Sequence, residues 1–109
     1  MIYFKENRQR EEFLKVDPEL KNIIEVFSAM LSAIYKVKTI ITSVYREDKH
    51  SPHYYFRAVD IRSREMKPSK CIELANIMNI IFKYGKGPYN TVIYHNVGSG
   101  WHFHLQVKP

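Results

Sequence analysis

This 109-residue sequence has few residues of the kinds that hold small proteins together covalently. A single cysteine, Cys71, excludes a disulfide within the chain and any zinc site built from cysteines. The sequence also lacks internal repeats, low-complexity tracts and any apolar run long enough to span a bilayer. No acidic residue follows Glu73, so the last third of the chain contains no carboxylate side chain that could serve in a functional site.

The balance of charge limits the kinds of partner. The chain has 17 Lys and Arg against 11 Asp and Glu, a net charge of +6 at pH 7, which favours anionic partners such as nucleic acid or bacterial wall polymers. The basic residues are scattered and form no dense block, and no nucleic-acid-binding signature accompanies them. We therefore expect no specific nucleic-acid partner, and we predict that residues 1–109 form a single domain that is monomeric.

We expect no secretory signal at the start of the chain. The segment Met1–Phe4 is followed at once by the charged residues of 5–12, whereas a signal peptide needs an unbroken apolar stretch. We therefore expect no membrane insertion and synthesis in the cytoplasm.

The apolar pattern predicts two helices and four strands. Asp17-Pro18 is typical of a helix start, and apolar residues then recur at helical spacing to about residue 35. A second helix begins at Pro68 and is stopped by residues 85–88. Runs of β-forming residues predict strands at 39–45, 58–61, 91–94 and 101–107. Because the connections are short, we expect an α+β fold with a small antiparallel sheet and both main helices packed on one face.

Two spaced groups of residues have the chemistry of metal ligands. His53 precedes Asp60 by seven positions, and His102 and His104 stand two apart in a run of β-formers. Residues two apart on a strand point to the same face, so strand geometry allows either of these two histidines to be a ligand. Two imidazoles and one carboxylate can hold zinc and leave a fourth position for water, as in hydrolytic centres.

These groups resemble the motifs of a known family of zinc peptidases. The segment Ser51–Asp60 is similar to the S-x-H-x-x-G-x-A-x-D motif of the D-alanyl-D-alanine and L-alanyl-D-glutamate metallopeptidases. The segment His102–His104 resembles the H-x-H motif of the wider group that joins those enzymes to lysostaphin-type peptidases and hedgehog. Residues 42–46 are similar to the strand-and-arginine segment that precedes the first ligand. The blocks agree in order and spacing over residues 17–107, which implies the fold shared by hedgehog and these peptidases.

The resemblance implies one zinc ion per chain, held by three protein ligands. His53 and Asp60 match the first two ligands of the family, and His104 matches the third. His102 would then face the zinc-bound water, as a base or as a stabiliser of the tetrahedral intermediate.

The resemblance also implies contacts with the substrate. Arg46 matches an arginine that meets a substrate carbonyl or carboxylate, where a guanidinium stabilises charge that develops in the transition state. Ser51 matches a hydroxyl near the substrate. Tyr54 belongs to the aromatic run 54–56, which either stacks on a substrate or closes the core.

The sequence departs from the family at two places. Phe56 stands where the motif has glycine, so the loop between the first two ligands must be built differently or be filled by the ring. Many members place Glu or Asp three residues before the last ligand as the general base, where this chain has Trp101, or Ser99 if the ligand register shifts. The base would then be His102, with His95 as a more distant candidate.

The resemblance predicts a zinc-dependent peptidase that cleaves peptidoglycan stem peptides, as a D,D-carboxypeptidase or an endolysin-type endopeptidase. The small size and basic surface suit a lytic enzyme of phage type, released to the cell wall or associated with a virion. The alternative is a non-catalytic zinc-binding recognition module of the same fold, comparable to hedgehog, which the missing carboxylate favours.

Overall fold

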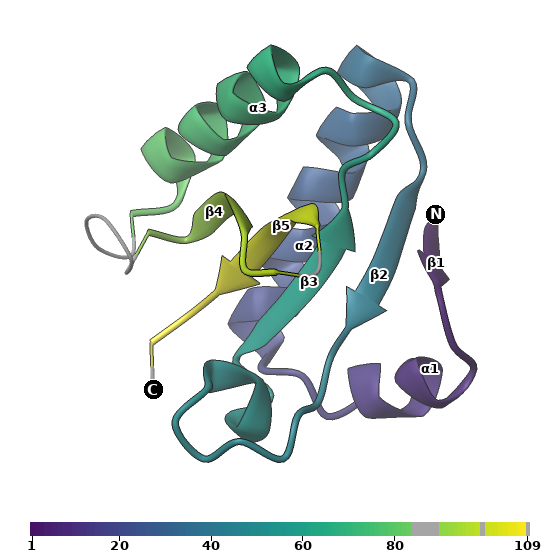
Figure 1. Ribbon diagram of the computed structural model, residues 1–109, viewed down its shortest axis with the longest axis vertical. Helices are drawn as coiled ribbons and strands as arrows, with labels where there is room; N and C mark the ends of the chain where they lie inside the picture. Colours follow the sequence, from purple (N-terminus) through teal and green to yellow (C-terminus); the bar gives the residue numbers. More distant parts are fainter. Residues whose placement is uncertain (84–89, 99, 109) are drawn as a thin grey trace.

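In a computed structural model of the chain, residues 1–83, 90–98 and 100–108 are described, and their strands form one five-stranded sheet (Figure 1). The strands are β1 (Ile2–Phe4), β2 (Thr39–Ser43), β3 (Ala58–Arg62), β4 (Val92–Asn96) and β5 (Trp101–Gln106). Their spatial order is β1-β2-β3-β5-β4. All neighbours pair antiparallel except β1 with β2, which are parallel. The predicted α+β class is confirmed.

The helices begin and end largely where capping chemistry predicts. They are α1 (Arg8–Phe13), α2 (Pro18–Met30) with its π-helical extension η1 (Leu31–Tyr35), the 3-10 turn η2 (Pro52–Tyr55), and α3 (Pro68–Ile81). The Asp17 carboxylate accepts the backbone N–H of Glu19 at 2.8 Å, which caps α2 as the sequence predicts. The predicted stop at 85–88 lies outside the described residues. None of the helices in the described ranges combines the length and apolar character needed to cross a membrane.

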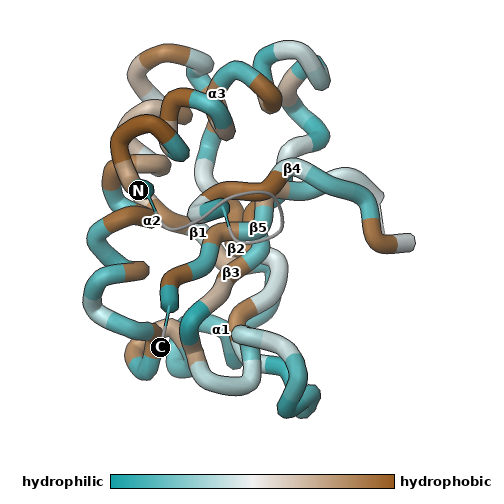
Figure 2. Tube along the Cα trace, turned by 90° about the vertical axis from the view of Figure 1, so that its left-hand side faces the viewer, coloured by the Kyte–Doolittle hydropathy of each residue, from teal (hydrophilic) through white to brown (hydrophobic). Residues whose placement is uncertain are grey.

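One face of the sheet forms the hydrophobic core together with both main helices. The strand residues Val59, Ile61, Phe103 and Leu105 alternate with outward residues and belong to the same buried cluster as residues of α2 and α3. The ring of Phe27 on α2 meets Phe103 edge-on, with 5.0 Å between ring centroids. Figure 2 shows α2 and α3 on the same side of the strands. The other face of β3 and β5, which points away from α2 and α3, carries the alternate residues of these strands.

Besides the short turn η2, the structure contains two elements that the sequence pattern does not predict, β1 and α1. Both are short, with three and six residues, and α1 lies within the charged segment that follows Phe4. The segment between β1 and β2 contains α1, α2 and η1, and this long crossover returns the chain in its original direction. The added strand therefore pairs parallel, beside four strands that pair antiparallel as predicted.

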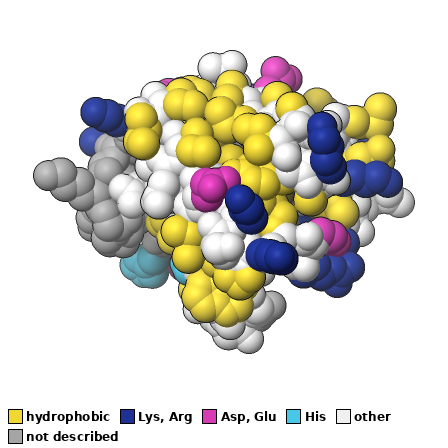
Figure 3. All heavy atoms as spheres, turned by 90° about the horizontal axis from the view of Figure 1, so that it is seen from above, with side chains coloured by type: hydrophobic (Ala, Val, Ile, Leu, Met, Phe, Trp, Pro, Cys, Tyr) yellow, Lys and Arg dark blue, Asp and Glu magenta, His cyan; other side chains and the backbone are white. Residues whose placement is uncertain are grey.

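Charged side chains are dispersed over the end of the molecule seen in Figure 3. Lys and Arg side chains lie there at separate places between hydrophobic ones. Elsewhere, several cations lie over aromatic rings, for example Arg57 over Tyr55 at 5.2 Å from the ring centroid. The surface in this view has no continuous basic stripe of the kind that tracks a nucleic-acid backbone.

Candidate metal centre

The sheet face opposite α2 and α3 carries the predicted site residues of three strands. Asp60 on β3 lies directly opposite His104 on β5, and His102 on β5 lies opposite His95 on β4. Residues paired across antiparallel strands point to the same face, so the register alone brings these side chains together. The strand alternation that buries Phe103 in the core thus turns both histidines of β5 away from it.

His53 reaches the same place from η2, between β2 and β3. The hydroxyl of Ser51 accepts the backbone N–H of His53 at 3.2 Å and so caps the turn. Phe56 ends the turn in the left-handed conformation, with φ of 58°. Glycine, which the resembled motif has at this position, adopts that conformation without a steric cost. The His53 side chain is fully buried (0% exposed).

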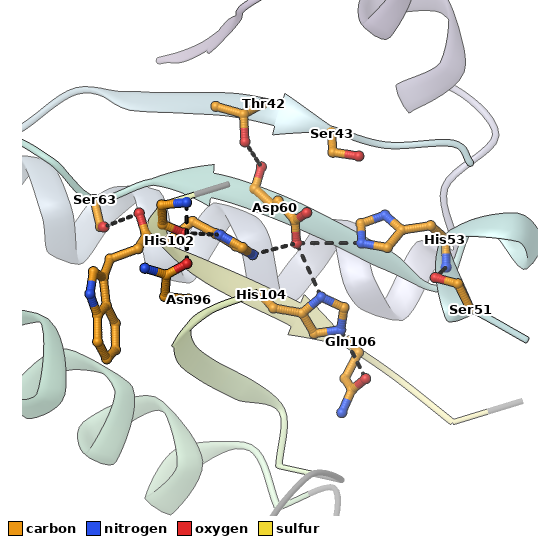
Figure 4. A network of polar contacts seen from close by, with 12 residues as sticks. Thr42, Ser43, Ser51, His53, Asp60, Ser63, Asn96, His102, His104 and Gln106 are labelled. Atoms are coloured by element: carbon orange, nitrogen blue, oxygen red, sulfur yellow. Dashed lines mark hydrogen bonds and ion pairs between the residues drawn. The ribbon is translucent and has the colours of Figure 1, made fainter. Parts of the chain in front are cut away.

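Three imidazoles converge on one carboxylate oxygen (Figure 4). Oδ1 of Asp60 lies 3.1 Å from Nδ1 of His104, 3.4 Å from Nε2 of His53 and 3.7 Å from Nε2 of His102. The first of these three distances is within hydrogen-bond range. The ligand atoms of His53, Asp60 and His104 all lie within 4.8 Å of one another, so this triad could hold a metal ion.

The outer nitrogen of each ring meets a backbone or amide oxygen. Nδ1 of His53 lies 2.8 Å from the carbonyl of Val44, and Nδ1 of His102 lies 3.1 Å from the carbonyl of Gly100. An oxygen acceptor assigns the ring N–H to the nitrogen that faces it. In both rings the lone pair of Nε2 is therefore on the side of Asp60.

His104 is oriented in the same way by a side chain. Its Nε2 lies 3.0 Å from Oε1 of Gln106, whose own amide nitrogen donates to the carbonyl of Asn90 at 2.9 Å. The second contact fixes the amide so that its oxygen faces the ring, which leaves Nδ1 of His104 toward Asp60. Outer partners of this kind orient the ligating histidines of metal sites and raise their basicity.

Three ring nitrogens and a carboxylate oxygen meet at the centre of the arrangement. Ring lone pairs and a carboxylate oxygen repel each other unless a proton or a metal ion lies between them. Nε2 of His53 is buried without a hydrogen-bond partner, and an unsatisfied buried polar atom costs about 1–3 kcal/mol. A metal ion bound by the triad would satisfy this atom, so the residues present fit such an ion.

Arg46 completes the surroundings of the carboxylate. Its guanidinium donates a short hydrogen bond from Nη2 to Oδ2 of Asp60, and its Nε donates to the Ser43 hydroxyl at 3.1 Å. Burial alone would raise the pKa of Asp60, but its interactions with the neighbouring His104 and His53 hold it well below the usual range. Asp60 is therefore ionised at neutral pH, with Oδ1 directed toward the imidazoles.

The other predicted residues lie around this centre in different roles. The ring centroid of His95 is 4.8 Å from that of His102 and 5.7 Å from that of His104. Burial and these two neighbours lower the pKa of His95, which favours its neutral form. The ring of Tyr54 contacts Tyr45 and Tyr55 at centroid distances of 5.9 and 5.0 Å, within an aromatic cluster beside η2.

Two partners of the ligands were not identified by the sequence analysis. Gln106 could have been identified, because it stands two residues after His104 and so shares its face of β5. The carbonyl of Val44 has no sequence signal, since every residue carries one.

Comparisons with known proteins identify no relative whose function could be compared with this site. No protein family matches the chain, and no curated protein matches it in sequence. The function is therefore argued from the residues of the site.

Proposed function

We propose that the protein is a zinc-dependent peptidase of the D-alanyl-D-alanine metallopeptidase type, acting on peptidoglycan stem peptides. The observation that carries the proposal is the buried, unsatisfied Nε2 of His53, which faces the same carboxylate oxygen of Asp60 as Nδ1 of His104. Two imidazole nitrogens and one carboxylate oxygen are a zinc ligand set that leaves a fourth position open. When bound, zinc would act as a Lewis acid on the substrate carbonyl and lower the pKa of a coordinated water.

His102 would move the proton in such a reaction. Its side chain is 12% exposed and its Nε2, which carries no hydrogen in the assigned tautomer, lies 3.7 Å from Oδ1 of Asp60. That nitrogen can accept a proton and return it to the leaving amine, as a general base and then a general acid. The chain offers no carboxylate for this task after Glu73.

Arg46 would bind the substrate oxygen. Its described hydrogen bonds use Nε and Nη2, which leaves Nη1 for a substrate carbonyl or carboxylate. The side chain is 45% exposed, so a ligand can reach it from solvent. Its contact with Asp60 holds the guanidinium in place before the substrate arrives, which is the preorganisation that stabilises developing charge.

A zinc-binding recognition module is the second candidate. Among the described residues, the histidines of the site form ion pairs with Asp60 alone, so no second carboxylate stands beside them as a base. A module of this kind would bind zinc and a ligand without turnover.

Muropeptide cleavage distinguishes the two candidates. Zinc-loaded protein is incubated with purified muropeptides of several stem types from about pH 5 to about pH 9, and the products are followed by mass spectrometry. The peptidase proposal predicts cleavage of at least one stem, lost after chelation and in the His102→Ala variant. If zinc is bound and no stem is cleaved at any pH, the peptidase proposal is wrong and the recognition module is the better account.

A further inference from the structure

A hollow of about 390 Å³ lies beside the metal centre, and its walls are basic. Four of its nine lining residues are Lys or Arg, and its one carboxylate belongs to Asp60. Asp60 is already paired with Arg46 and contacts three imidazoles, so it does not neutralise the other cations. The hollow therefore carries a local excess of positive charge.

The sheet places these cations at one end of the site. Arg62 follows Asp60 by two residues on β3, on the same face, and lies opposite His102. Lys5 follows β1, where its backbone N–H donates to the carbonyl of Ile41 on β2 at 2.9 Å. Arg64 comes from the turn after β3 and lines the same hollow. Residues far apart in the sequence thus gather beside the centre.

The three cations have little compensating charge from the protein. Lys5 and Arg62 form no ion pair with any residue in the described ranges. Arg64 meets Glu65 at 3.5 Å, but these side chains are 72% and 45% exposed, and exposed pairs of this kind contribute little. Gathering like charges in one hollow is unfavourable unless a ligand supplies the opposite charge.

We propose that Lys5, Arg62 and Arg64 form a subsite for the carboxylate groups of an acidic peptide substrate, beside the bond to be cleaved. This inference rests on the proposed peptidase function, because the hollow shares Arg46, Asp60 and His102 with the metal centre. A guanidinium presents paired N–H groups that match the two oxygens of a carboxylate. The subsite selects stems with free carboxylates over stems in which these groups are amidated.

A peptide fits this hollow better than a nucleic acid does. Its volume is within the range of sites for small ligands, about 300–1,000 Å³. Single-stranded nucleic acid is bound along an extended basic groove with several aromatic rings on which the bases stack. Trp101 is the only aromatic residue, other than His102, among those that line the hollow, and its ring packs on Tyr94 at a centroid distance of 4.9 Å.

The test compares one stem peptide with free carboxylates and the same peptide with these groups amidated. Binding to the zinc-loaded full chain is measured by calorimetry, and cleavage is followed in the same samples by mass spectrometry. We expect the free-carboxylate peptide to bind about tenfold more tightly, with a preference that declines as salt is added. Arg62→Gln and Lys5→Gln should each remove about threefold to tenfold of this preference, and Arg62→Lys should retain part of it.

The control variant is Lys83→Gln, which removes a cation that lines a different hollow and should leave the preference unchanged. Equal binding of the two peptides, an unchanged preference in Arg62→Gln, or tighter binding of a short single-stranded oligonucleotide would overturn the subsite. Tighter binding of the free-carboxylate peptide without any cleavage would support the subsite and contradict the proposed peptidase function. Cleavage of both peptides with equal binding would contradict the subsite and leave the peptidase function supported. The test therefore distinguishes failure of the subsite from failure of the proposed function.

Discussion

Nε2 of His104 and Oε1 of Gln106 lie 3.0 Å apart on one face of β5. The carbonyl of Asn90 holds the amide nitrogen of Gln106, so the amide oxygen faces the ring and assigns its N–H to Nε2. Nδ1 is then the nitrogen that faces Asp60. A side chain outside the triad thus decides which atom of His104 is available to a metal ion.

Replacing Gln106 should weaken metal binding without removing a ligand. We expect Gln106→Leu to lower zinc affinity about 10- to 100-fold, because the ring loses the acceptor that orients it. Gln106→Glu keeps an oxygen at that position and should retain more of the affinity. Competition with a chelating dye measures both. The control Asn79→Leu removes a side-chain amide that bonds Val92 between α3 and β4, and it should lower stability while leaving zinc affinity unchanged.

The two histidines of β5 should respond differently to removal. His104→Ala is expected to lose bound zinc, since its Nδ1 belongs to the triad. His102→Ala is expected to keep the zinc and lose peptide cleavage. Elemental analysis and the muropeptide assay on the same two preparations check this, and the reverse pattern would exchange the two roles.

The left-handed conformation of Phe56 predicts an order of stabilities. Its ring stacks on Tyr45 with 5.1 Å between centroids, so truncation to Ala removes this contact and should destabilise the protein by about 2 kcal/mol. Phe56→Gly removes the same ring but also the strain of φ at 58°, and it should be about 1 kcal/mol more stable than Phe56→Ala. Urea unfolding measures the difference. Equal stability of the two variants would show that the backbone is not strained there.

Asp60 should make the metal-free protein sensitive to acid. Its pKa in the folded protein is well below the usual range, so it contributes stability that is fully present above its unfolded pKa of about 3.9. That contribution is lost as the pH falls below about 4 toward the folded pKa. The free energy of unfolding should therefore decline there more steeply in the wild type than in Asp60→Asn. Urea unfolding of both metal-free proteins at several acidic pH values checks this, and parallel declines would contradict it.

The fold was predictable where the sequence signals are local and strong. Asp17-Pro18 marks the start of α2, and alternation in 101–107 places His102 and His104 on one face, as the structure has them. The strand β1 was missed because three residues beside a charged run have no period, and its pairing depends on a crossover that no local pattern reveals.

The site was predictable only in part for a related reason. Spacings within the sequence predict His53, Asp60 and one of the two histidines of β5 as ligands, and the resemblance selects His104. The carbonyl of Val44 that contacts His53 is a backbone group, so no sequence pattern predicts it. The basic residues are scattered along the chain, yet Lys5, Arg62 and Arg64 line one hollow because strand order brings their ends together. Basic residues that are scattered along the sequence can therefore lie close together in the folded protein.

The central claim is that His53, Asp60 and His104 bind one zinc ion, and the zinc content of the untagged protein tests it most directly. Elemental analysis of protein purified without added metal should find one zinc per chain, and chelation should lower its melting temperature, because a ligand that binds only the folded state stabilises it. Less than about a tenth of an equivalent, with no rebinding of added zinc, would contradict the metal centre itself.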